Sequence, residues 1–410
     1  MAQVFSAEKA TPNRQDASLH LAYGVWLALA IASASSNAQS ILGVSSRYVL
    51  IAAYAVTALL LLSRVPRLRY PPGELFLFLS IIVAASLAAY LTSLTAFLGA
   101  ALFVFASRSA DLRQLARTTL LGGLGGLLIV TLLVASGDAL DLELVRVGSD
   151  WARHSFGFRH PNTLGMLILN LCLAWVVLAG PRSTLLWKLP VVGAAFFCWS
   201  LLDSRSAILL LVVLLTLWGL RSTRVGELVL LLAPLVPMLA VLATLILTFM
   251  YEPTSPTWAA LDEALSSRLS LGHAYLTAYG VSPLGQPIAL GDIPDSQLGS
   301  LVATGRATVD VGYISLLLQA GWVGLLAFTS LLVLAGRNAR ASGDRSIAIC
   351  TVVFALSGVF ETTVYGLQYG FCLFVSAMGT STGGTVGMEQ MAKASLEKRN
   401  SAGARKWRVR

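Results

Sequence analysis

Residues 151–180 read WARHSFGFRHPNTLGMLILNLCLAWVVLAG and join a cluster of polar and cationic side chains directly to a long apolar run. The run, 163–180, is long enough at about 1.5 Å per residue to cross most of a hydrocarbon core of about 30 Å as a helix. The cluster is therefore expected at the mouth of a membrane helix. Because charged and polar groups are costly beside a membrane, they usually mark a site for a charged ligand.

The composition of the whole chain indicates a membrane protein. Hydrophobic residues make up 56% of the 410 residues, charged residues make up 12%, and the mean hydropathy is +0.75, whereas a soluble domain has about 25% charged residues. Apolar runs of roughly 17–25 residues recur along the chain, and the alternating segments of about ten residues that are typical of a transmembrane barrel do not. The sequence therefore predicts an all-α, polytopic helical membrane protein.

We expect about twelve transmembrane helices, with the N- and C-termini in the cytoplasm. The expected spans are 19–38, 48–63, 73–91, 93–107, 119–137, 163–180, 186–202, 205–220, 228–250, 312–336, 346–365 and 367–384. This orientation satisfies the positive-inside rule, because it places 22 of the 29 lysines and arginines on the cytoplasmic side. The external basic residues are all arginines, namely Arg47, Arg146, Arg153, Arg159, Arg205, Arg268 and Arg306.

Two external loops are long, whereas every other connection is short. The first loop, 138–161, contains the opening cluster, and the second, 251–311, lies between the ninth and tenth expected helices. Loops carry function when a rigid scaffold positions them, so we assign 1–387 to a membrane domain whose two long loops form the active site. The segment 388–410 is interpreted as a basic cytoplasmic tail beside anionic lipid. The net charge of +9 therefore needs no nucleic-acid partner.

Familiar cofactor motifs are missing from the sequence. The cysteines Cys172, Cys198, Cys350 and Cys372 all fall inside apolar runs and lack metal-ligand spacing, so they are interpreted as small core residues. The chain contains no dinucleotide fingerprint, phosphate-binding loop, zinc-protease motif or nucleophile elbow. We therefore expect neither a metal nor another cofactor, and the energy for a reaction would come from an activated substrate.

The arginines of the opening cluster are the first candidates for substrate binding. Arg153 and Arg159 flank Phe156 and Phe158. A guanidinium group binds phosphate bidentately and keeps its charge at a membrane surface, so such a loop could clamp a lipid-linked diphosphate while the aromatic rings meet the acyl boundary. The alternative interpretation is that both arginines lie at the interface and pair with nearby carboxylates.

Two further arginines are expected on the same external face. Arg205 is fixed at the outer membrane surface by the tight turn between the seventh and eighth expected helices, with Asp203 as its alternative partner. Arg268 belongs to an expected amphipathic helix, 257–279, where it shares a face with Tyr275. Both arginines are candidate phosphate contacts, and Tyr275 is a candidate substrate contact.

Two histidines, an amide and a carboxylate complete the candidates. His160 and Asn162 begin the helix that follows the cluster, where a histidine could act as a base or donate a hydrogen bond to an anion. Helix capping is the alternative role for both residues. His273 lies on a different side of the amphipathic helix and is either catalytic or a packing residue. Glu361, near the outer end of the eleventh span, either pairs with an external arginine or acts as an acid or base.

Four short segments lie in order on or beside the two outer loops. They are SFGFRHPNTLG at 155–165, DSRS at 203–206, SRL at 267–269 leading to SPLG at 282–285, and YISLLLQAGWVG at 313–324. In sequence and order they resemble the Wzy-type polysaccharide polymerases and O-antigen ligases of bacterial envelopes. The HPN form of the first segment is similar to that of the capsule and exopolysaccharide polymerases.

The resemblance implies a glycosyltransferase that needs neither metal nor nucleotide. Such an enzyme would polymerise undecaprenyl-diphosphate-linked oligosaccharide repeat units at the outer face of the bacterial cytoplasmic membrane, alongside a flippase and a chain-length regulator. Arg159, Arg205 and Arg268 would hold the donor diphosphate. One of the two histidines would activate the acceptor hydroxyl, with Glu361 as its partner.

Two alternatives remain open at this stage. A ligase of the same superfamily would transfer the glycan once, to a different acceptor. A secondary transporter or lipid-linked glycan flippase also fits twelve spans, but it predicts internal repeats and charged or broken helices near the middle of the membrane. The sequence has no convincing repeat and an almost uncharged interior, which favours the polymerase.

Overall fold

The computed structural model describes residues 14–35, 40–41, 44–45, 58, 62, 64–108, 110–145, 152–180, 184–288 and 309–379. Within this part of the chain the protein is all-α apart from two short hairpins. Five of the described helices are long and apolar enough to cross a membrane, or six if one bent pair counts as a single span. The expected span 48–63 (apart from two isolated residues), the loop residues 289–308 and the tail 388–410 lie outside the described residues.

Between residues 72 and 219 the described helices follow the expected spans closely. The described helices of the whole chain are α1 (Arg14–Ser33), α3 (Pro72–Thr92), α4 (Thr95–Ala106), α5 (Leu112–Ala135), α6 (Pro161–Ala179), α7 (Leu185–Phe197), α8 (Arg205–Gly219), α9 (Arg224–Leu232), α10 (Val236–Phe249), α11 (Pro256–Ala264), α12 (Arg268–Tyr279), α14 (Gly312–Ser342) and α15 (Arg345–Phe360). A π-helical turn, η2 (Cys198–Leu202), extends α7. Short 3-10 segments are η1 (Val65–Arg67), η4 (Thr362–Tyr365), η5 (Leu367–Tyr369) and η6 (Phe371–Ala377).

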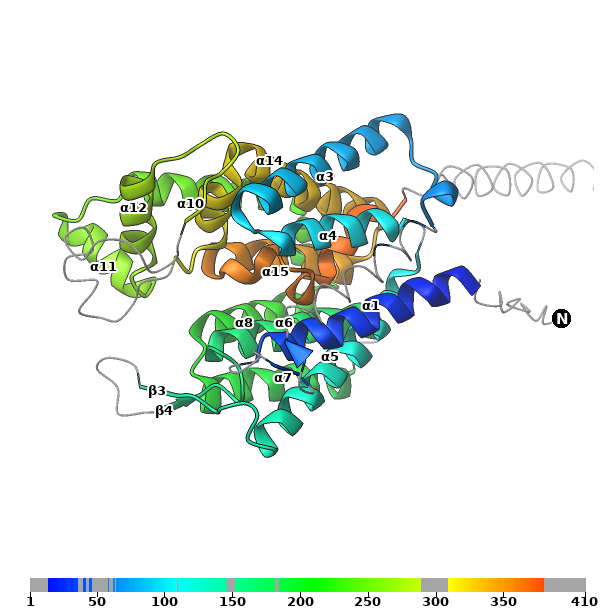
Figure 1. The fold of residues 1–410 in the computed structure, drawn as a ribbon, viewed down its shortest axis with the longest axis horizontal. Coiled ribbons are helices and arrows are strands. Elements are labelled where there is room, and N and C mark those ends of the chain that lie inside the picture. Colours follow the sequence, from blue (N-terminus) through cyan, green and yellow to red (C-terminus); the bar gives the residue numbers. More distant parts are fainter. Residues whose placement is uncertain are drawn as a thin grey trace, which may run out of the picture. The chain divides into compact units, whose positions relative to one another are not determined.

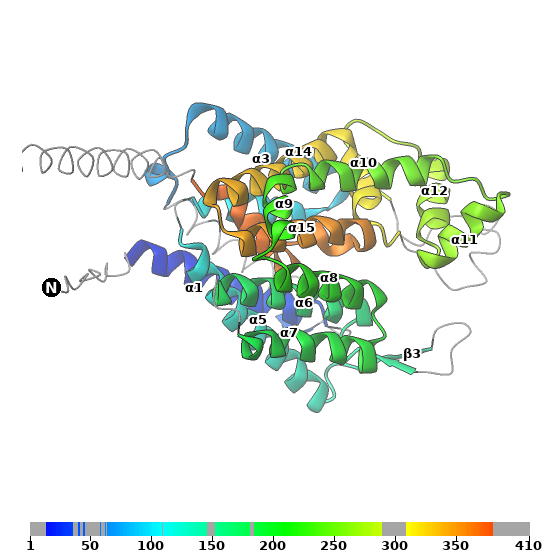
Figure 2. The ribbon, with the colours of Figure 1, turned by 180° about the vertical axis from the view of Figure 1, so that it is seen from behind.

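Helix α15 forms the centre of the helical bundle. It packs against α6 and α8 and also against α10 and α14, so it lies between the two groups of helices that Figures 1 and 2 show. Almost all of its residues are buried, because the helix is apolar all round and has no face suited to water. Its C-terminal end is followed directly by Glu361.

The contact between α1 and α5 depends on small residues. A Cβ atom added at Gly122 would lie 2.7 Å from the carbonyl oxygen of Gly24, and one at Gly126 would lie 2.8 Å from Cβ of Ile31. The absence of side chains at these glycines lets the two backbones approach closely, which is a common basis of helix packing in membranes. The glycine-rich part of α5 is therefore a packing surface.

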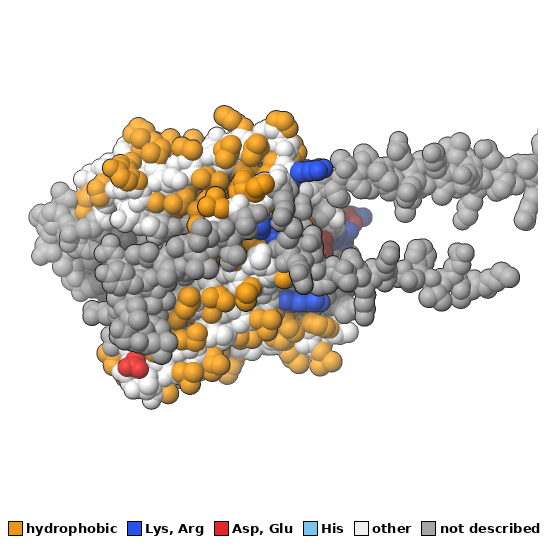
Figure 3. Space-filling view, turned by 45° about the vertical axis from the view of Figure 1, so that its right-hand side comes forward, with side chains coloured by type: hydrophobic (Ala, Val, Ile, Leu, Met, Phe, Trp, Pro, Cys, Tyr) orange, Lys and Arg blue, Asp and Glu red, His pale blue; other side chains and the backbone are white. Residues whose placement is uncertain are grey.

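Large apolar side chains cover the outward faces of several helices. On α5 they include Leu121, Leu124, Leu128 and Leu132, all of them exposed, and Figure 3 shows further hydrophobic side chains spread over one face of the protein. A soluble protein rarely exposes contiguous apolar surface of this kind. The described helices thus carry a surface suited to lipid.

The expected single span 228–250 is divided in the structure. Helix α9 ends at Leu232 and α10 begins at Val236. Proline explains the division, since Pro234 and Pro237 lack the N–H groups that a continuous helix would use. The prediction of one helix was wrong here because hydropathy registers only that the segment is apolar.

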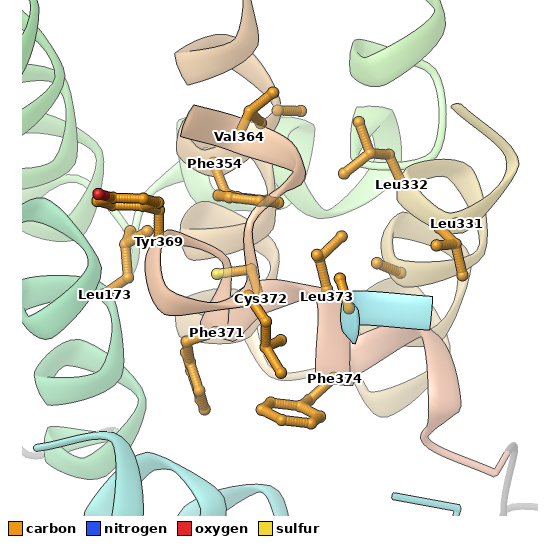
Figure 4. Packing of buried hydrophobic residues seen from close by; sticks show 14 of the residues in the cluster. Leu173, Leu331, Leu332, Phe354, Val364, Tyr369, Phe371, Cys372, Leu373 and Phe374 are labelled. Atoms are coloured by element: carbon orange, nitrogen blue, oxygen red, sulfur yellow. The ribbon is translucent and has the colours of Figure 1, made fainter. Parts of the chain in front are cut away.

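The expected twelfth span, 367–384, is also not a helix of membrane length. Residues 362–377 form the short segments η4, η5 and η6, which are separated by Gly366 and Gly370. Their side chains pack into the bundle, as Figure 4 shows for Tyr369 of η5 beside Leu173 of α6, and for Phe371 and Phe374 of η6. The prediction of a helix here was wrong, because it was based on apolar composition. Apolar composition does not determine whether the backbone is α-helical.

Two buried asparagines satisfy the backbone of this irregular region. Asn170 donates to the carbonyl of Gln368 at 3.1 Å and accepts from the N–H of Phe371 at 2.8 Å. Asn338 donates to the carbonyls of Val375, Ser376 and Met378 at 2.9–3.1 Å. Non-helical backbone at membrane depth is tolerated only where protein buries and satisfies it. These two side chains therefore allow the 3-10 segments to lie among the helices.

Helix α14 is broken at Gly321, and the start of the second long loop fills the break. Gly321 has a φ of +68°. The N–H groups of Trp322 and Val323 donate to the carbonyls of Ser282 and Pro283 at 3.4 and 3.1 Å. Two segments whose bonded residues are 40 positions apart in sequence, 282–285 and 319–323, are thus joined backbone to backbone. The loop is anchored on α14 rather than free.

We expect Gly285→Ala to destabilise this junction more than Gly280→Ala. Both glycines have a positive φ, +85° and +67°, so alanine is strained at either position. Only at Gly285 would the new Cβ collide with the carbonyl oxygen of Gln319, since Gly280 has no heavy atom within 4 Å of that place. The added collision should lower the free energy of unfolding by about 1–3 kcal/mol beyond the control, measured by thermal unfolding in detergent. Equal effects would show that the loop does not dock on α14.

Candidate functional site

The carboxylate of Glu361 is the centre of a buried polar network. The side chain follows α15 and is 5% exposed. Its Oε1 atom accepts hydrogen bonds from Asn162 Nδ2 at 3.1 Å and from Arg268 Nη2 at 3.3 Å. The hydroxyl of Ser206 donates to the same oxygen. A single carboxylate oxygen therefore links three segments that are far apart in the sequence.

Asn162 connects this carboxylate to a second arginine. Its Oδ1 atom accepts from Arg153 Nη2 at 3.0 Å and from Ser204 Oγ at 3.1 Å. Arg153 is 7% exposed, and its Nε atom donates to the carbonyl of Leu202 at 3.1 Å. That carbonyl ends the π-helical turn η2, where the regular hydrogen-bonding pattern stops. The guanidinium group thus stabilises the turn and orients the amide.

Three helix N-termini converge on the network. Asn162 is the second residue of α6, Ser206 is the second residue of α8, and Arg268 is the first residue of α12. The starts of α6 and α8 are in close contact, because a Cβ at Gly165 would lie 2.8 Å from Ser204 Oγ. Helix N-termini carry partial positive charge, so the arrangement stabilises a buried carboxylate and favours a second anion nearby.

A short hairpin places Arg153 at this end of the bundle. Strand β3 (Glu143–Val145) pairs with β4 (Ala152–His154) in antiparallel register. The carboxylate of Asp141 fixes the following turn, accepting from the N–H of Phe156 at 2.7 Å and contacting His154 Nδ1 at 3.0 Å. The other described hairpin, β1 (Ser40–Ile41) with β2 (Val44–Ser45), holds none of the candidate residues. The opening cluster is therefore a rigid turn that leads into α6.

Arg268 is held on several sides as well. Its Nε atom donates to the carbonyl of Phe360 at 3.0 Å, and Nη1 donates to the carbonyl of Leu265 at 3.2 Å. The start of α12 is fixed by Asp262, whose Oδ1 accepts from two backbone N–H groups of that helix at 2.9 and 3.1 Å. Arg268 is consequently a fixed part of the network, and its guanidinium group is largely occupied by protein acceptors.

Arg159 and Arg205 are arranged differently from the two buried arginines. Both are exposed, and among the described residues neither forms a side-chain hydrogen bond or ion pair. Arg159 precedes the cap residue of α6, and Arg205 is the first residue of α8. Because the two helix starts are in contact through Gly165 and Ser204, Arg159 and Arg205 belong to the same pair of helix N-termini, and no described residue accepts a hydrogen bond from either guanidinium group. Such a pair of helix starts suits an anionic ligand.

The two candidate histidines lie in different surroundings. His160 caps α6, since its Nδ1 accepts from the N–H of Asn162 at 3.1 Å. Because Nδ1 accepts in this cap, the ring hydrogen of His160 is carried by Nε2. His273 Nδ1 lies 3.1 Å from the carbonyl of Thr248, and the ring packs beside Tyr251. Its hydrogen is therefore on Nδ1, and Nε2 is the atom able to accept a proton.

The structure brings together Arg153, Asn162, Arg268 and Glu361, which the sequence proposed from separate segments. His273 belongs to the contact between α12 and α10, away from these partners. Tyr275 is fully buried and stacks on Tyr279 with ring centroids 5.9 Å apart. The position of Tyr275 suits packing of α12 better than contact with a substrate.

The electrostatics of Glu361 follow from its position just beyond the end of α15. Burial raises the pKa of Glu361 to about 7, while the guanidinium of Arg268 and the hydroxyl of Ser206 lower it in part. Asp310 raises the same pKa slightly and Arg153 lowers it. The carboxyl group therefore changes its charge close to neutral pH, which suits a group that takes up or releases a proton.

Sequence reasoning did not assign a role to Ser204, Ser206 or Asp262. The two serines were visible only as part of the short DSRS segment, since an isolated hydroxyl carries no pattern of its own. Asp262 precedes the helix that it caps by six residues, which is farther than the usual capping position. Within the described part of the chain, no group of three or more His, Cys, Asp or Glu residues is arranged to hold a metal ion.

Comparisons with protein-family models, with curated proteins and with solved structures return no match for this chain. The function is therefore argued from the geometry of the site. The fold and site define an all-α protein with membrane-length apolar helices, and with a polar, arginine-rich network at one end of its bundle.

Proposed function

We propose that this protein is a membrane glycosyltransferase that polymerises undecaprenyl-diphosphate-linked oligosaccharide repeat units. The observation that carries the proposal is the pair of exposed arginines, Arg159 and Arg205, at the touching N-termini of α6 and α8. Two guanidinium groups beside two helix N-termini suit a diphosphate. The buried network behind them fixes both helix starts, so the binding groups are preorganised.

In the proposed reaction, a sugar hydroxyl of the acceptor attacks the anomeric carbon of the donor. The new carbon–oxygen bond forms as the bond from the anomeric carbon to the diphosphate oxygen breaks, and the lipid diphosphate leaves with the electron pair. Arg159 and Arg205 stabilise the negative charge that grows on the leaving group. His160 Nε2–H adds a hydrogen bond to the same anion.

The hydroxyl proton passes to a base on the protein. Glu361 is our first candidate, because its pKa of about 7 suits proton uptake and it contacts residues from all three helix starts. His273 remains the second candidate, with Nε2 as the accepting atom. Arg268 and Arg153 act as positioning residues in this scheme, since their contacts orient Glu361 and Asn162.

The proposed location is the cytoplasmic membrane of a bacterium, with the network on the external face. The distribution of basic residues supports this orientation. A flippase that delivers the lipid-linked repeat unit and a regulator of chain length are the expected functional partners. No nucleotide or metal takes part in the proposed reaction.

The decisive experiment uses the purified full-length protein in vesicles with an undecaprenyl-diphosphate oligosaccharide. We expect the substrate to be converted into a ladder of products that differ by one repeat unit, resolved by electrophoresis or mass spectrometry. A single transfer to a different glycan or lipid acceptor would instead identify a ligase. The assay is repeated with lipid-linked repeat units of several polysaccharide types. If all of these substrates remain unchanged, the proposal is contradicted.

A second candidate, transport of the lipid-linked glycan, is favoured by one structural observation. Helix α14 is broken at Gly321 and residues 362–377 are irregular, and such interruptions are typical of transporter binding sites. Translocation of a labelled lipid-linked glycan across vesicles, without any change in its mass, would support transport. Chain extension without translocation would support the polymerase.

A further inference from the structure

A groove lies on the bundle at the end opposite to Glu361. It is formed by α3, α10 and α14 and has a volume of about 340 Å³. Helix α14 begins at Gly312, which packs against the backbone of Glu361, whereas the groove follows the second half of the same helix from Leu326 to Arg337. The groove is therefore separate from the polar network.

The walls of the groove are almost entirely apolar. Leu77 of α3 and Met238 of α10 face Leu326, Val333 and Leu334 of α14. The two hydroxyl groups in the lining, those of Thr329 and Ser330, donate to carbonyls of α14 itself at 2.7 and 2.8 Å. No lining hydroxyl hydrogen is thus left for a polar ligand, and the walls suit a hydrocarbon chain.

The length of the groove matches half a bilayer. Arg337 follows Leu326 by eleven positions, which corresponds to about 16 Å of helix, and half of a hydrocarbon core is about 15 Å. Leu77 lies in the second turn of α3 and Met238 in the first turn of α10, and both line the groove beside α14. The groove extends from the end of the bundle to about its middle.

Among the described residues that line the groove, Arg337 is the one that carries a charge. Its side chain is exposed, and within the same part of the chain it has no hydrogen bond or ion pair. A cation at the end of an apolar channel complements a ligand that joins a hydrocarbon chain to an anionic group.

We propose that the groove binds one anionic phospholipid from the leaflet opposite to the polar network. One acyl chain lies against α3, α10 and α14, and the headgroup phosphate contacts Arg337. Because α10 also supports α12 and α14 also contacts Glu361, the bound lipid stabilises the packing of helices that reach the site. This inference does not depend on the reaction that the protein catalyses.

The test compares phosphatidylglycerol with phosphatidylcholine of identical acyl chains, added to the delipidated full-length protein. Bound lipid is counted by native mass spectrometry, and the melting temperature is measured in parallel. One arginine near a lipid surface contributes about 1 kcal/mol, so we expect the anionic lipid to bind about fivefold more tightly. Arg337→Gln should remove this preference, whereas Arg340→Gln, an exposed neighbour outside the groove, should retain it.

A second variant tests the acyl chain. Val333→Phe places a larger side chain in the groove and should reduce the amount of both lipids that is retained. The protein should still bind more phosphatidylglycerol than phosphatidylcholine. Equal loss of preference in Arg337→Gln and Arg340→Gln would overturn the proposal in favour of diffuse surface charge. Full competition by glycerol phosphate, which lacks acyl chains, would show that only a free anion binds. Unchanged retention in Val333→Phe would exclude the groove.

Discussion

Replacing both Arg159 and Arg205 by glutamine is expected to lower kcat/KM for polymerisation roughly 100- to 10,000-fold without unfolding the protein. Each hydrogen-bonded contact to a charged group contributes about 1.5–3 kcal/mol, and two such contacts to the diphosphate would be lost. Both side chains are exposed, so their removal leaves no buried group unsatisfied. The measurement is the initial rate of ladder formation, with the melting temperature as a check of folding.

The matched control for this variant is Arg117→Gln combined with Arg340→Gln. These arginines are also exposed, but they belong to α5 and α14 and lie outside the site. The control has the same net charge as Arg159→Gln with Arg205→Gln, so a general effect of charge would slow both proteins equally. Lysine at 159 and 205 should restore part of the rate, because it keeps the charge but not the bidentate geometry. A rate within threefold of the wild type in the glutamine variant would exclude the diphosphate site.

The sequence predicted the helices best where turn chemistry marked their ends. The prediction of a span at 163–180 corresponds to α6 (Pro161–Ala179), and 205–220 corresponds to α8 (Arg205–Gly219). Pro161 is the first residue of α6. Proline is suited to this position because the N–H group that it lacks would have no intrahelical partner there. Local chemistry of this kind acts over a few residues, so it can be recognised in a single sequence.

The sequence could not predict where apolar segments leave the helical path. The 3-10 segments between Thr362 and Ala377 include the apolar run FCLFV at 371–375, and the backbone of this region is satisfied by Asn170 and Asn338 from other helices. Likewise, the break at Gly321 is filled by the backbone of residues 282–285. In both places the irregular backbone is hydrogen-bonded by residues far away in the sequence. Hydropathy and turn propensity are local properties, so they cannot predict these contacts.

The candidate site was predicted as a set of residue types rather than as a geometry. The need to neutralise or solvate charges beside a membrane identified Arg153, Arg268 and Glu361. The division between buried and exposed arginines was not predictable, because it depends on which carbonyls happen to lie nearby, such as those of Leu202 and Phe360. The structure thus divides four similar arginines into two that are buried in the network, Arg153 and Arg268, and two that are exposed, Arg159 and Arg205.

Glu361→Ala is expected to be strongly destabilising and to abolish activity. It removes the common acceptor of Asn162, Ser206 and Arg268, and each donor left unsatisfied in a buried place costs about 1–3 kcal/mol. The free energy of unfolding should fall by about 3–5 kcal/mol, as for other buried charges that lose a partner. Activity should disappear in the same variant, measured at a temperature at which the protein remains folded.

Glu361→Gln separates the charge of this residue from its packing. The amide oxygen can still accept from Asn162 and Ser206, so the fold should largely survive. Burial raises the pKa of Glu361 to about 7 from an ordinary value of 4.5, so the folded state binds the proton more tightly than the unfolded state. Wild-type stability should therefore decrease relative to the glutamine variant as the pH rises from about 4.5 to about 7, and then remain constant.

The pH dependence of activity assigns the role of the carboxylate. If the ionised form of Glu361 accepts the proton of the acceptor hydroxyl, the wild-type rate rises as the pH passes through about 7. Glu361→Gln should then retain a small, pH-independent rate in this range, because the remaining groups still bind the diphosphate. The opposite result is a pH–rate profile whose inflection near neutral pH persists in Glu361→Gln and disappears in His273→Gln. This result would identify His273 as the base, with Nε2 as the atom that accepts the proton.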